Sequence, residues 1–430
     1  MTTHTRPVPE GVGAPRAQEL LPMLDLFSGC GGLSLGLEAS GFRPVAFAEI
    51  SHEAAETYRL NRNHELVRFV RASELLHAAA GRRVRALLRE MHHRELDLVC
   101  GGPPCQGFST RGQRRTQYAE TSSIPANHLY LDMVKIVNEF RPKVFLFENV
   151  AGLLHAKWNR NESARVFDDV LGAFRRTLQT DYLMDWSLLE AWRYGVPQLR
   201  RRLFLVGLRN DVARKALGAR SVRLKPSGHA IEAGLLPAPD LIPSTPSPEQ
   251  VIGNLVDPSY LEGLVTTHYA HAPKGEFQEQ ARLGVSPDAL TEQVYSEHRL
   301  HTIRKFSALI RNHGVLPEKY QTKKFGLRLL PRDWPHGIPN LTITTMPDDF
   351  VHYQQPRTLT VRECARFQTF PDWYRFFGRR STGGHQRAGR PSLGQWDRAT
   401  PKYTQIGNAV PVKLAEKIGR HLLTLIRPEK

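Results

Sequence analysis

The segment Asp97–Ser109, with the sequence DLVCGGPPCQGFS, places a thiol on a stiff loop. An apolar stretch ends at Cys100, and the Pro103-Pro104 pair that follows has fixed φ angles. In a cationic protein, a thiol beside backbone N–H groups has a lowered pKa and acts as a nucleophile. The segment therefore predicts covalent catalysis by Cys105, and the competing interpretation is an inert, partly buried cysteine.

A carboxyl group, Glu148, stands at the end of the apolar run Val144–Phe147. At the mouth of a sheet and beside apolar walls, its pKa should be raised, because burial disfavours the charged form. Glu148 is thus a candidate proton donor. The competing interpretation is a solvated acid at a strand end.

Three polar residues, Gln198, Arg200 and Arg202, alternate immediately before the apolar run Leu203–Gly207. In an extended segment Arg200 and Arg202 share one face. Their planar guanidinium groups suit phosphates or the carbonyl of a base. The competing interpretation is a solvated basic turn.

A glycine-rich turn lies in the segment Met23–Glu38, with the sequence MLDLFSGCGGLSLGLE. Its glycines permit positive φ and close approach of a ligand, and a helix N-terminus follows. The turn departs from the dinucleotide fingerprint because Ser34 stands in place of the third glycine. Glu49, roughly 20 residues further on, has the spacing for ribose hydroxyls. The pattern favours a nucleoside cofactor without a pyrophosphate, and the competing interpretation is a turn needed only for packing.

These candidates follow short apolar runs that alternate with helix-like stretches such as Leu129–Phe140 and Ala164–Leu178. Such alternation predicts an α/β fold with a mostly parallel, Rossmann-like sheet that binds ligands beyond the carboxyl ends of its strands. The expected strands are Met23–Phe27, Val45–Ile50, Val67–Val70, Leu96–Cys100, Val144–Glu148, Met184–Leu189 and Leu203–Gly207.

The alternation of strand-like and helix-like segments stops after Gly207, which predicts that the chain is divided into several domains or segments. We expect a flexible tail over 1–20, a catalytic domain over 21–208, and a smaller irregular domain over 209–356 that contains the proline-rich segment Pro237–Pro248. Residues 357–430 should return to the catalytic domain and end in a helix over Pro411–Ile426, with a basic loop over 378–398.

The amino-acid composition favours a nucleic-acid-binding protein and argues against a membrane protein or a secreted disulfide-rich protein. The 430 residues carry 59 Lys and Arg against 42 Asp and Glu, a formal charge of +17 that suits a polyanion such as nucleic acid. No apolar run is long enough to cross a bilayer, and no secretory signal is evident. The four cysteines form neither a disulfide scaffold nor a CxxC pair for zinc, so we expect no metal and a cytoplasmic protein.

Taken together and in order, these motifs resemble the C5-cytosine DNA methyltransferases of bacterial restriction–modification systems. The resemblance covers nearly the whole chain and rests on DLFSGCGG, Glu49, GGPPCQGFS, ENV, QxRxR, the block Arg357–Pro371 (RTLTVRECARFQTFP) and the block Tyr403–Pro411 (YTQIGNAVP).

The resemblance implies a mechanism and its residues. Cys105 would attack C6 of a flipped-out cytosine, Glu148 would protonate N3, and Arg200 and Arg202 would hold the base and its backbone, with S-adenosylmethionine as methyl donor. The residues expected around this cofactor are Phe27, Ser28, Gly29, Gly31, Glu49, Ile50, Pro104, Leu129, Asn408 and Ala409.

The resemblance also makes 209–356 the target-recognition domain for double-stranded DNA. Expected DNA contacts are Gln106, Ser109, Gln198, Lys323, Lys324, Arg379 and Arg380. One departure concerns the acidic residue that the family often has near the adenine after the third strand: here only a displaced Glu74 is present.

Two other functions are compatible with the motifs. A catalytically silent relative would bind DNA without methylating it, but Cys105, Glu148, Arg200 and Arg202 are all present. A related branch methylates tRNA and is usually short in the region where this chain has 209–356, so the length favours DNA. We expect a monomer of bacterial or phage origin, with any cognate restriction endonuclease acting independently.

Overall fold

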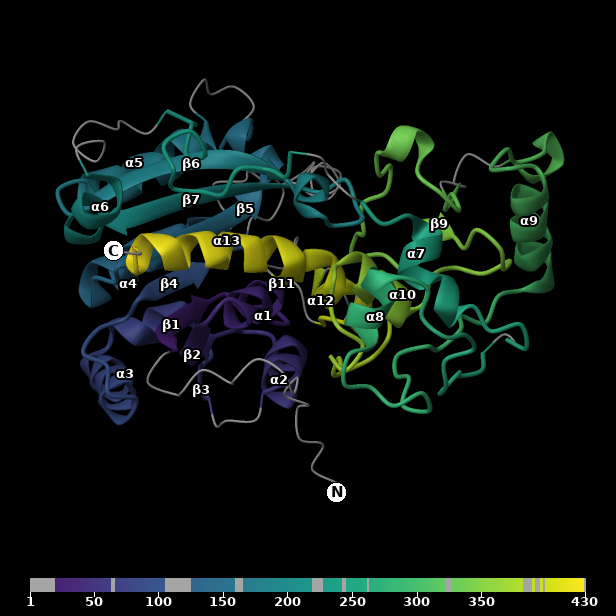
Figure 1. Ribbon diagram of the computed structural model, residues 1–430, viewed down its shortest axis with the longest axis horizontal. Coiled ribbons are helices and arrows are strands. Elements are labelled where there is room, and N and C mark those ends of the chain that lie inside the picture. Colours follow the sequence, from purple (N-terminus) through teal and green to yellow (C-terminus); the bar gives the residue numbers. More distant parts are fainter. Residues whose placement is uncertain are drawn as a thin grey trace.

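The computed structural model describes residues 20–62, 66–104, 125–158, 165–218, 227–241, 245–260, 263–321, 327–381, 389–390, 395–396 and 399–428. Its centre is a seven-stranded sheet in the order β3-β2-β1-β4-β5-β7-β6 (Figure 1). The strands are β1 (Leu21–Leu26), β2 (Phe42–Ala48), β3 (Val67–Phe69), β4 (Leu98–Gly101), β5 (Val144–Val150), β6 (Tyr182–Glu190) and β7 (Arg201–Arg209). β7 pairs antiparallel with both neighbours, and the other strands run in one direction.

Helices cover both faces of the sheet. The first face packs against α3 (Ala78–Glu90), α4 (Tyr130–Phe140) and α5 (Val166–Leu178), through side chains such as Val84, Met133 and Phe174. The second face packs against α1 (Gly32–Ala39), α6 (Asn210–Leu217) and α13 (Val412–Ile426). The result is the Rossmann-like α/β fold that the sequence predicted, and all seven expected strands are present.

Glycines bring the C-terminal segment close to α1. A Cβ on Gly32 would lie 2.5 Å from the carbonyl oxygen of Val410, and one on Gly36 would lie 2.3 Å from that of Val412. Only glycine allows such an approach. The predicted closing helix is therefore present as α13, and it lies beside the helix that follows the glycine-rich turn (Figure 1).

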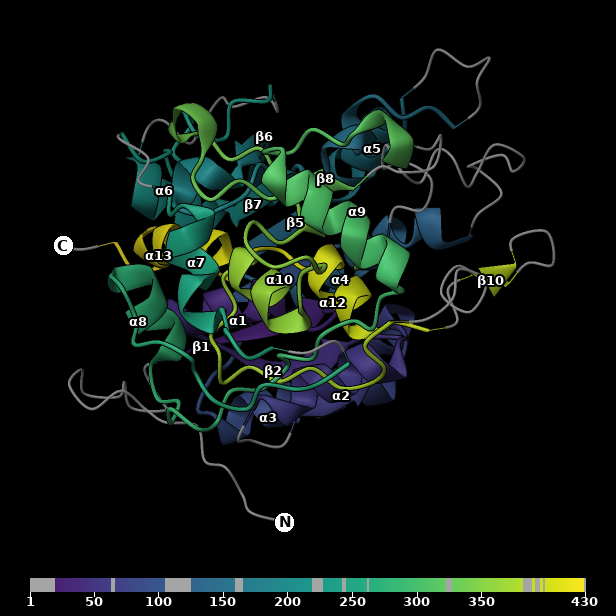
Figure 2. The ribbon, with the colours of Figure 1, turned by 90° about the vertical axis from the view of Figure 1, so that its right-hand side faces the viewer.

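The remaining helices and short strands lie mostly beyond the carboxyl ends of the sheet strands, with α9 facing the viewer in Figure 2. They are α2 (His52–Leu60), α7 (Pro248–Ile252), α8 (Glu276–Arg282), α9 (Leu300–Arg311), α10 (Val361–Phe367), α12 (Lys402–Asn408), β8 (Arg328–Leu329), β9 (Phe350–Val351), β10 (Gly389–Arg390) and β11 (Gln395–Trp396).

Buried ion pairs hold the block Arg357–Pro371 in this second region. Arg357 donates to both carboxylate oxygens of Glu363 at 2.8 and 2.7 Å, and Arg366 binds Asp372 in the same two-pronged way at 3.0 and 2.6 Å. All four side chains are buried. Removing one partner would leave an unpaired buried charge, so each pair fixes the position of its segments.

No helix in the described part of the chain combines the length and apolarity that a membrane span requires.

Candidate active site

The sheet order reverses direction between β1 and β4, which are hydrogen-bonded neighbours. In open α/β sheets the crevice beyond the carboxyl ends at such a switch point is where ligands bind. Here the crevice is bordered by the glycine-rich turn after β1 and by the Gly-Gly-Pro-Pro loop after β4.

Glu148, Gly102 and Arg202 meet at this edge of the sheet. A Cβ on Gly102 would lie 2.6 Å from Oε2 of Glu148, so the carboxylate packs directly against the loop backbone. Nε of Arg202 lies 2.9 Å from Oε1 of Glu148, and both side chains are nearly buried. The register explains this pair, because Glu148 of β5 faces Phe204 of β7, two residues from Arg202.

Burial raises the pKa of Glu148, while the cations Arg202 and Arg200 lower it. Burial is the largest of these influences, so the net pKa is above its ordinary value. The raised pKa has the direction that the sequence predicted for this carboxyl group, and its role as a proton donor stays a prediction.

Asn149 ties the loop after β4 to β5. Its side-chain amide donates to the carbonyl oxygen of Pro103 at 3.1 Å, and its Oδ1 accepts from the N–H of Val150 at 2.9 Å. The sequence analysis attributed no role to Asn149. The adjoining predicted residues Cys105, Gln106 and Ser109 lie outside the described residues.

The turn after β1 has the backbone that its glycines predicted. Gly29 and Gly31 have φ values of 55° and 84°, and Phe27 adopts 54°. Space also requires glycine at position 31, because a Cβ there would lie 2.9 Å from the ring of Tyr58. Ser28 contributes a buried hydroxyl that has no hydrogen-bond partner among the described residues.

Glu49 joins the turn to the next helix. Its carboxylate accepts from the N–H of Gly29 at 2.8 Å and from the N–H of Ser51 at 2.7 Å. Burial raises the pKa of Glu49, and these two donors oppose the shift. The carboxylate oxygens keep further lone pairs for a hydroxyl donor.

The other residues predicted around a cofactor vary in exposure. Ile50 is 69% exposed, and Asn408 and Pro104 are also exposed, whereas Leu129 and Ala409 are half-buried. Asn408 ends α12, directly after Gly407, where a Cβ would lie 2.3 Å from the backbone of Thr344.

Gln198 has a different place from the one predicted. Its side chain is fully buried, and its amide donates to the carbonyl of Phe367 at 2.7 Å and to Oε1 of Gln368 at 2.8 Å. Its own oxygen accepts from the N–H of Ile343 at 3.3 Å. The predicted DNA contact by Gln198 is therefore corrected, because this side chain has neither exposure nor a spare donor directed at solvent.

Arg200 is also turned inward, at 2% exposure. Its guanidinium donates to the carbonyls of Ile343, Gly407 and Ala409 at 3.1, 2.8 and 2.9 Å. Burial lowers its pKa well below the ordinary value. Arg200 was predicted to lie beside the substrate, but its hydrogen bonds go to the backbone of two distant segments, and it is Arg202 that pairs with Glu148.

The other residues predicted to contact DNA differ in their exposure and partners. Arg379 is exposed, and Arg380 donates to the carbonyl of Val294 at 3.1 Å. Lys323 and Lys324 lie outside the described residues. Glu74, the displaced acid, accepts from the backbone N–H of Arg71 at 3.1 Å, so its carboxylate caps its own turn.

A buried polar network beneath the turn was missed by the sequence analysis. Asp25 accepts a hydrogen bond from Ser34, to which the hydroxyl of Tyr58 donates at 3.0 Å. Arg62 lies 3.5 Å from the centre of the Tyr58 ring and pairs with Glu38. Burial raises the pKa of Asp25 to about 7. Its only sequence signal was the polar residues Asp25 and Ser34 inside otherwise apolar segments.

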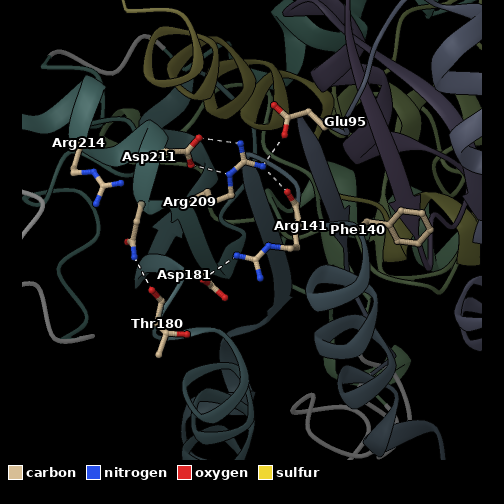
Figure 3. Close-up of a pocket in the computed structure, with 9 residues that line it drawn as sticks. Glu95, Phe140, Arg141, Thr180, Asp181, Arg209, Asp211 and Arg214 are labelled. Carbon is tan, nitrogen blue, oxygen red and sulfur yellow. Dashed lines mark hydrogen bonds and ion pairs between the residues drawn. The ribbon is translucent and has the colours of Figure 1, made fainter.

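The hollow drawn in Figure 3 lies elsewhere and has a volume of about 600 Å³. It is lined by residues at the other ends of the strands, and its charges are largely paired: Arg209 binds Glu95 and Asp211, and Arg141 binds Asp181. It therefore has no part in the site described above.

Known proteins are similar to this chain over most of its length. A family model described as C-5 cytosine-specific DNA methylase matches residues 21–424. The Type II methyltransferase M.XorII of Xanthomonas oryzae pv. oryzae is 30% identical over 418 residues, which cover 95% of this chain and 86% of that protein. M.DdeI of Desulfomicrobium norvegicum is 29% identical over 413 residues, with coverages of 93% and 88%.

A solved structure gives the same fold. It is described as a DNA modification methyltransferase encoded within an E. coli prophage, and it superposes with a TM-score of 0.65 at 23% identity. The match covers 94% of this chain and 99% of the other.

Proposed function

This chain belongs to the C-5 cytosine-specific DNA methylase family, and we propose that it methylates a cytosine flipped out of duplex DNA through a covalent adduct to Cys105. Membership makes it a DNA cytosine-5-methyltransferase of the restriction–modification type. The covalent step, the flipped base and the individual residues below belong to the proposal.

The position of Glu148 carries the proposal. Its carboxyl group lies against Gly102, three residues before Cys105 in the chain, and is paired with Arg202 at 2.9 Å. A cytosine in this crevice would meet a thiol and a carboxyl group together. C5 and C6 are attacked from the face of the ring, which stacking blocks in a duplex, so the base must leave the helix.

The proposed reaction begins with a bond between the Cys105 sulfur and C6, while Glu148 gives a proton to N3. The electron pair of the C5–C6 bond then makes C5 nucleophilic, and the protonated ring carries no net negative charge. Arg202 orients the carboxyl group of Glu148 and adds a cation beside the base. After methylation, a solvent water molecule takes the proton from C5, the C5–C6 double bond forms again and the S–C6 bond breaks to release the thiolate. N3 returns its proton to Glu148.

The family implies S-adenosylmethionine, which supplies an electrophilic methyl group at C5. The residues beside the crevice fit such a ligand. Gly29 and Gly31 allow the backbone to approach it, and the buried Ser28 hydroxyl has no other partner among the described residues. We assign Glu49 to the ribose, and Phe27, Ile50, Pro104, Leu129, Asn408 and Ala409 to the remaining contacts.

The test begins with bisulfite sequencing of DNA from cells that express the protein, which identifies the methylated cytosine. A duplex with 5-fluorocytosine at that position should then give a complex that survives denaturing electrophoresis, because fluorine cannot leave C5 as the proton does. Cys105→Ser should form no such complex and should methylate nothing. Full methylation by Cys105→Ser would disprove the covalent route. Transfer RNA as a competing acceptor should receive no methyl groups.

A further inference from the structure

The helix α3 and the turn after it carry a set of arginines that the active site does not use. Between Arg82 and Arg94 the chain has five arginines, no lysine and a single carboxylate, Glu90. The five are Arg82, Arg83, Arg85, Arg89 and Arg94, and all are exposed. This is a dense positive patch within a catalytic region whose overall charge is much closer to balance.

Helical spacing places three of these arginines on one stripe. Arg82, Arg85 and Arg89 stand at positions i, i+3 and i+7, while Val84 and Leu88 point into the core from another side of the helix. Arg82 and Arg89 lie outside the buried face of α3, and Arg85 lies at its border, 5.5 Å from the centre of the Phe140 ring. Its length from Arg82 to Arg89 is about 10 Å, at about 1.5 Å per residue.

Most of these side chains are free to bind a ligand. Among the described residues, only Arg85 has an ion-pair partner: Glu139, at 2.6 Å, with both side chains 49% exposed. An exposed pair of this kind is weak and exchanges readily for another anion. The other four arginines have no hydrogen-bond or ion-pair partner for their side chains in the described part of the chain.

The location of α3 separates it from the catalytic crevice. Figure 1 shows α3 on the β1–β3 side of the sheet, where it packs against β2, while the region with α7, α9 and α10 lies at the far side of the molecule. Figure 2 likewise places α3 low and behind that region. A straight duplex seated at the carboxyl ends of the strands would not lie along this helix.

We propose that the arginine stripe of α3 binds the phosphate backbone of a second DNA segment, outside the catalytic crevice. The inference rests on the proposed function, because a DNA methyltransferase works among a large excess of DNA. Arginine is the cation whose planar fork matches phosphate oxygens, and the patch contains arginine only. About 10 Å of helix passes about three phosphates of one strand, at about 3.4 Å each. No bases need be read, so the contact is independent of sequence.

The test uses the triple variant Arg82→Gln/Arg85→Gln/Arg89→Gln in the full-length protein. Glutamine is a good helix former, so α3 should persist. The matched control is Arg175→Gln/Arg176→Gln/Arg214→Gln, which removes the same charge from exposed arginines on α5 and α6. Each protein is bound to an immobilised duplex, washed, and offered a second, labelled duplex.

The wild type and the control should retain the second duplex, and the α3 variant should lose most of it. The slope of log K against log salt for duplex binding should fall by about 2 to 3, at about 0.9 per lost phosphate contact. Methylation of a short duplex by the α3 variant should stay within about twofold of the wild type. Equal retention by all three proteins would overturn the proposal and point to an acidic protein surface as the partner of α3. Failure of the proposed function would look different, since no protein would methylate the short duplex.

Discussion

Arg200 and Arg202 belong to one motif and lie two residues apart, yet they serve different regions of the molecule. Arg202 faces Glu148 in the crevice, whereas Arg200 donates to three backbone carbonyls from the segments 341–345 and 406–409. Gln198 joins the second group by binding Phe367 and Gln368. One half of the motif thus pairs with Glu148 in the crevice, and the other half joins distant segments to β7.

This difference shows that residues of one regularly spaced polar motif can have different roles. Residues 198, 200 and 202 share a face by alternation, but the segments that cover that face decide which side chain meets the substrate. Gln198 and Arg200 point inward and hold other segments in place, so both are positioning residues. Five predictions separate the two groups.

The largest effect should follow Glu148→Gln. The amide keeps the shape of the side chain but cannot deliver a proton, so kcat should fall by about 10²- to 10⁴-fold. The midpoint of thermal unfolding should change little, because a buried carboxyl group with a raised pKa contributes little stability as a charge. Single-turnover methylation and thermal melts check both parts. A loss of less than tenfold would remove Glu148 from the chemistry.

Replacement of either arginine by methionine should split activity from stability. Arg202→Met should lower kcat by about 10²-fold, which is the loss expected when one preorganised hydrogen-bond donor is removed. The free energy of unfolding should change little. Arg200→Met removes the arginine donor from the carbonyls of Ile343 and Gly407, while the carbonyl of Ala409 keeps the side-chain amide of Gln368, so the change should cost about 2–4 kcal/mol of stability.

The same split should be visible in cofactor binding. Calorimetric titration with S-adenosylmethionine, without DNA, should show weaker binding to Arg200→Met, because Gly407 and Ala409 lose their anchor. Arg200→Lys should recover part of the binding and part of the stability. If Arg200→Met and Arg202→Met had the same activity, stability and cofactor affinity, the proposed difference between the two arginines would be wrong.

The pH dependence of kcat/KM should sharpen the role of Arg202. Glu148 donates a proton only while protonated, so activity should decline as pH rises through its pKa. The guanidinium of Arg202 lowers that pKa, and its removal in Arg202→Met should move the decline to higher pH. The decline of kcat/KM at high pH should be absent in Glu148→Gln, which would identify Glu148 as the titrating group. A shift to lower pH in Arg202→Met would contradict the assignment.

The smallest effect should follow Gln198→Ala in DNA binding. Because the side chain is fully buried, the slope of log K against log salt should stay within about 0.3 of the wild-type slope. Stability should fall by about 1–3 kcal/mol, since Phe367 and Gln368 lose their partner. A slope reduced by about 1 would return Gln198 to the DNA interface.

Much of the catalytic region could be predicted from local pattern. Runs such as Val144–Glu148 and Leu203–Gly207 are buried on both faces of the sheet. Strands of this kind can be predicted because their apolar residues are continuous in the sequence. Glu148 at a strand end and the positive φ of Gly29 and Gly31 follow from the same local reasoning. The inward turn of Gln198 and Arg200 could not be predicted this way, because their partners at 343, 367 and 407 lie about 140 to 210 residues away. The domain boundaries at 208 and 356 stay predictions.

The close contact of α1 with the segment that begins α13 has a consequence for the order of folding. Gly32 and Gly36 admit the backbone of Val410 and Val412, which follow the whole of the second region in the chain. A growing chain can form β1 and the turn after it early, but the segment that packs against α1 is synthesised much later. The packing of α1 is therefore completed only after the second region has been made.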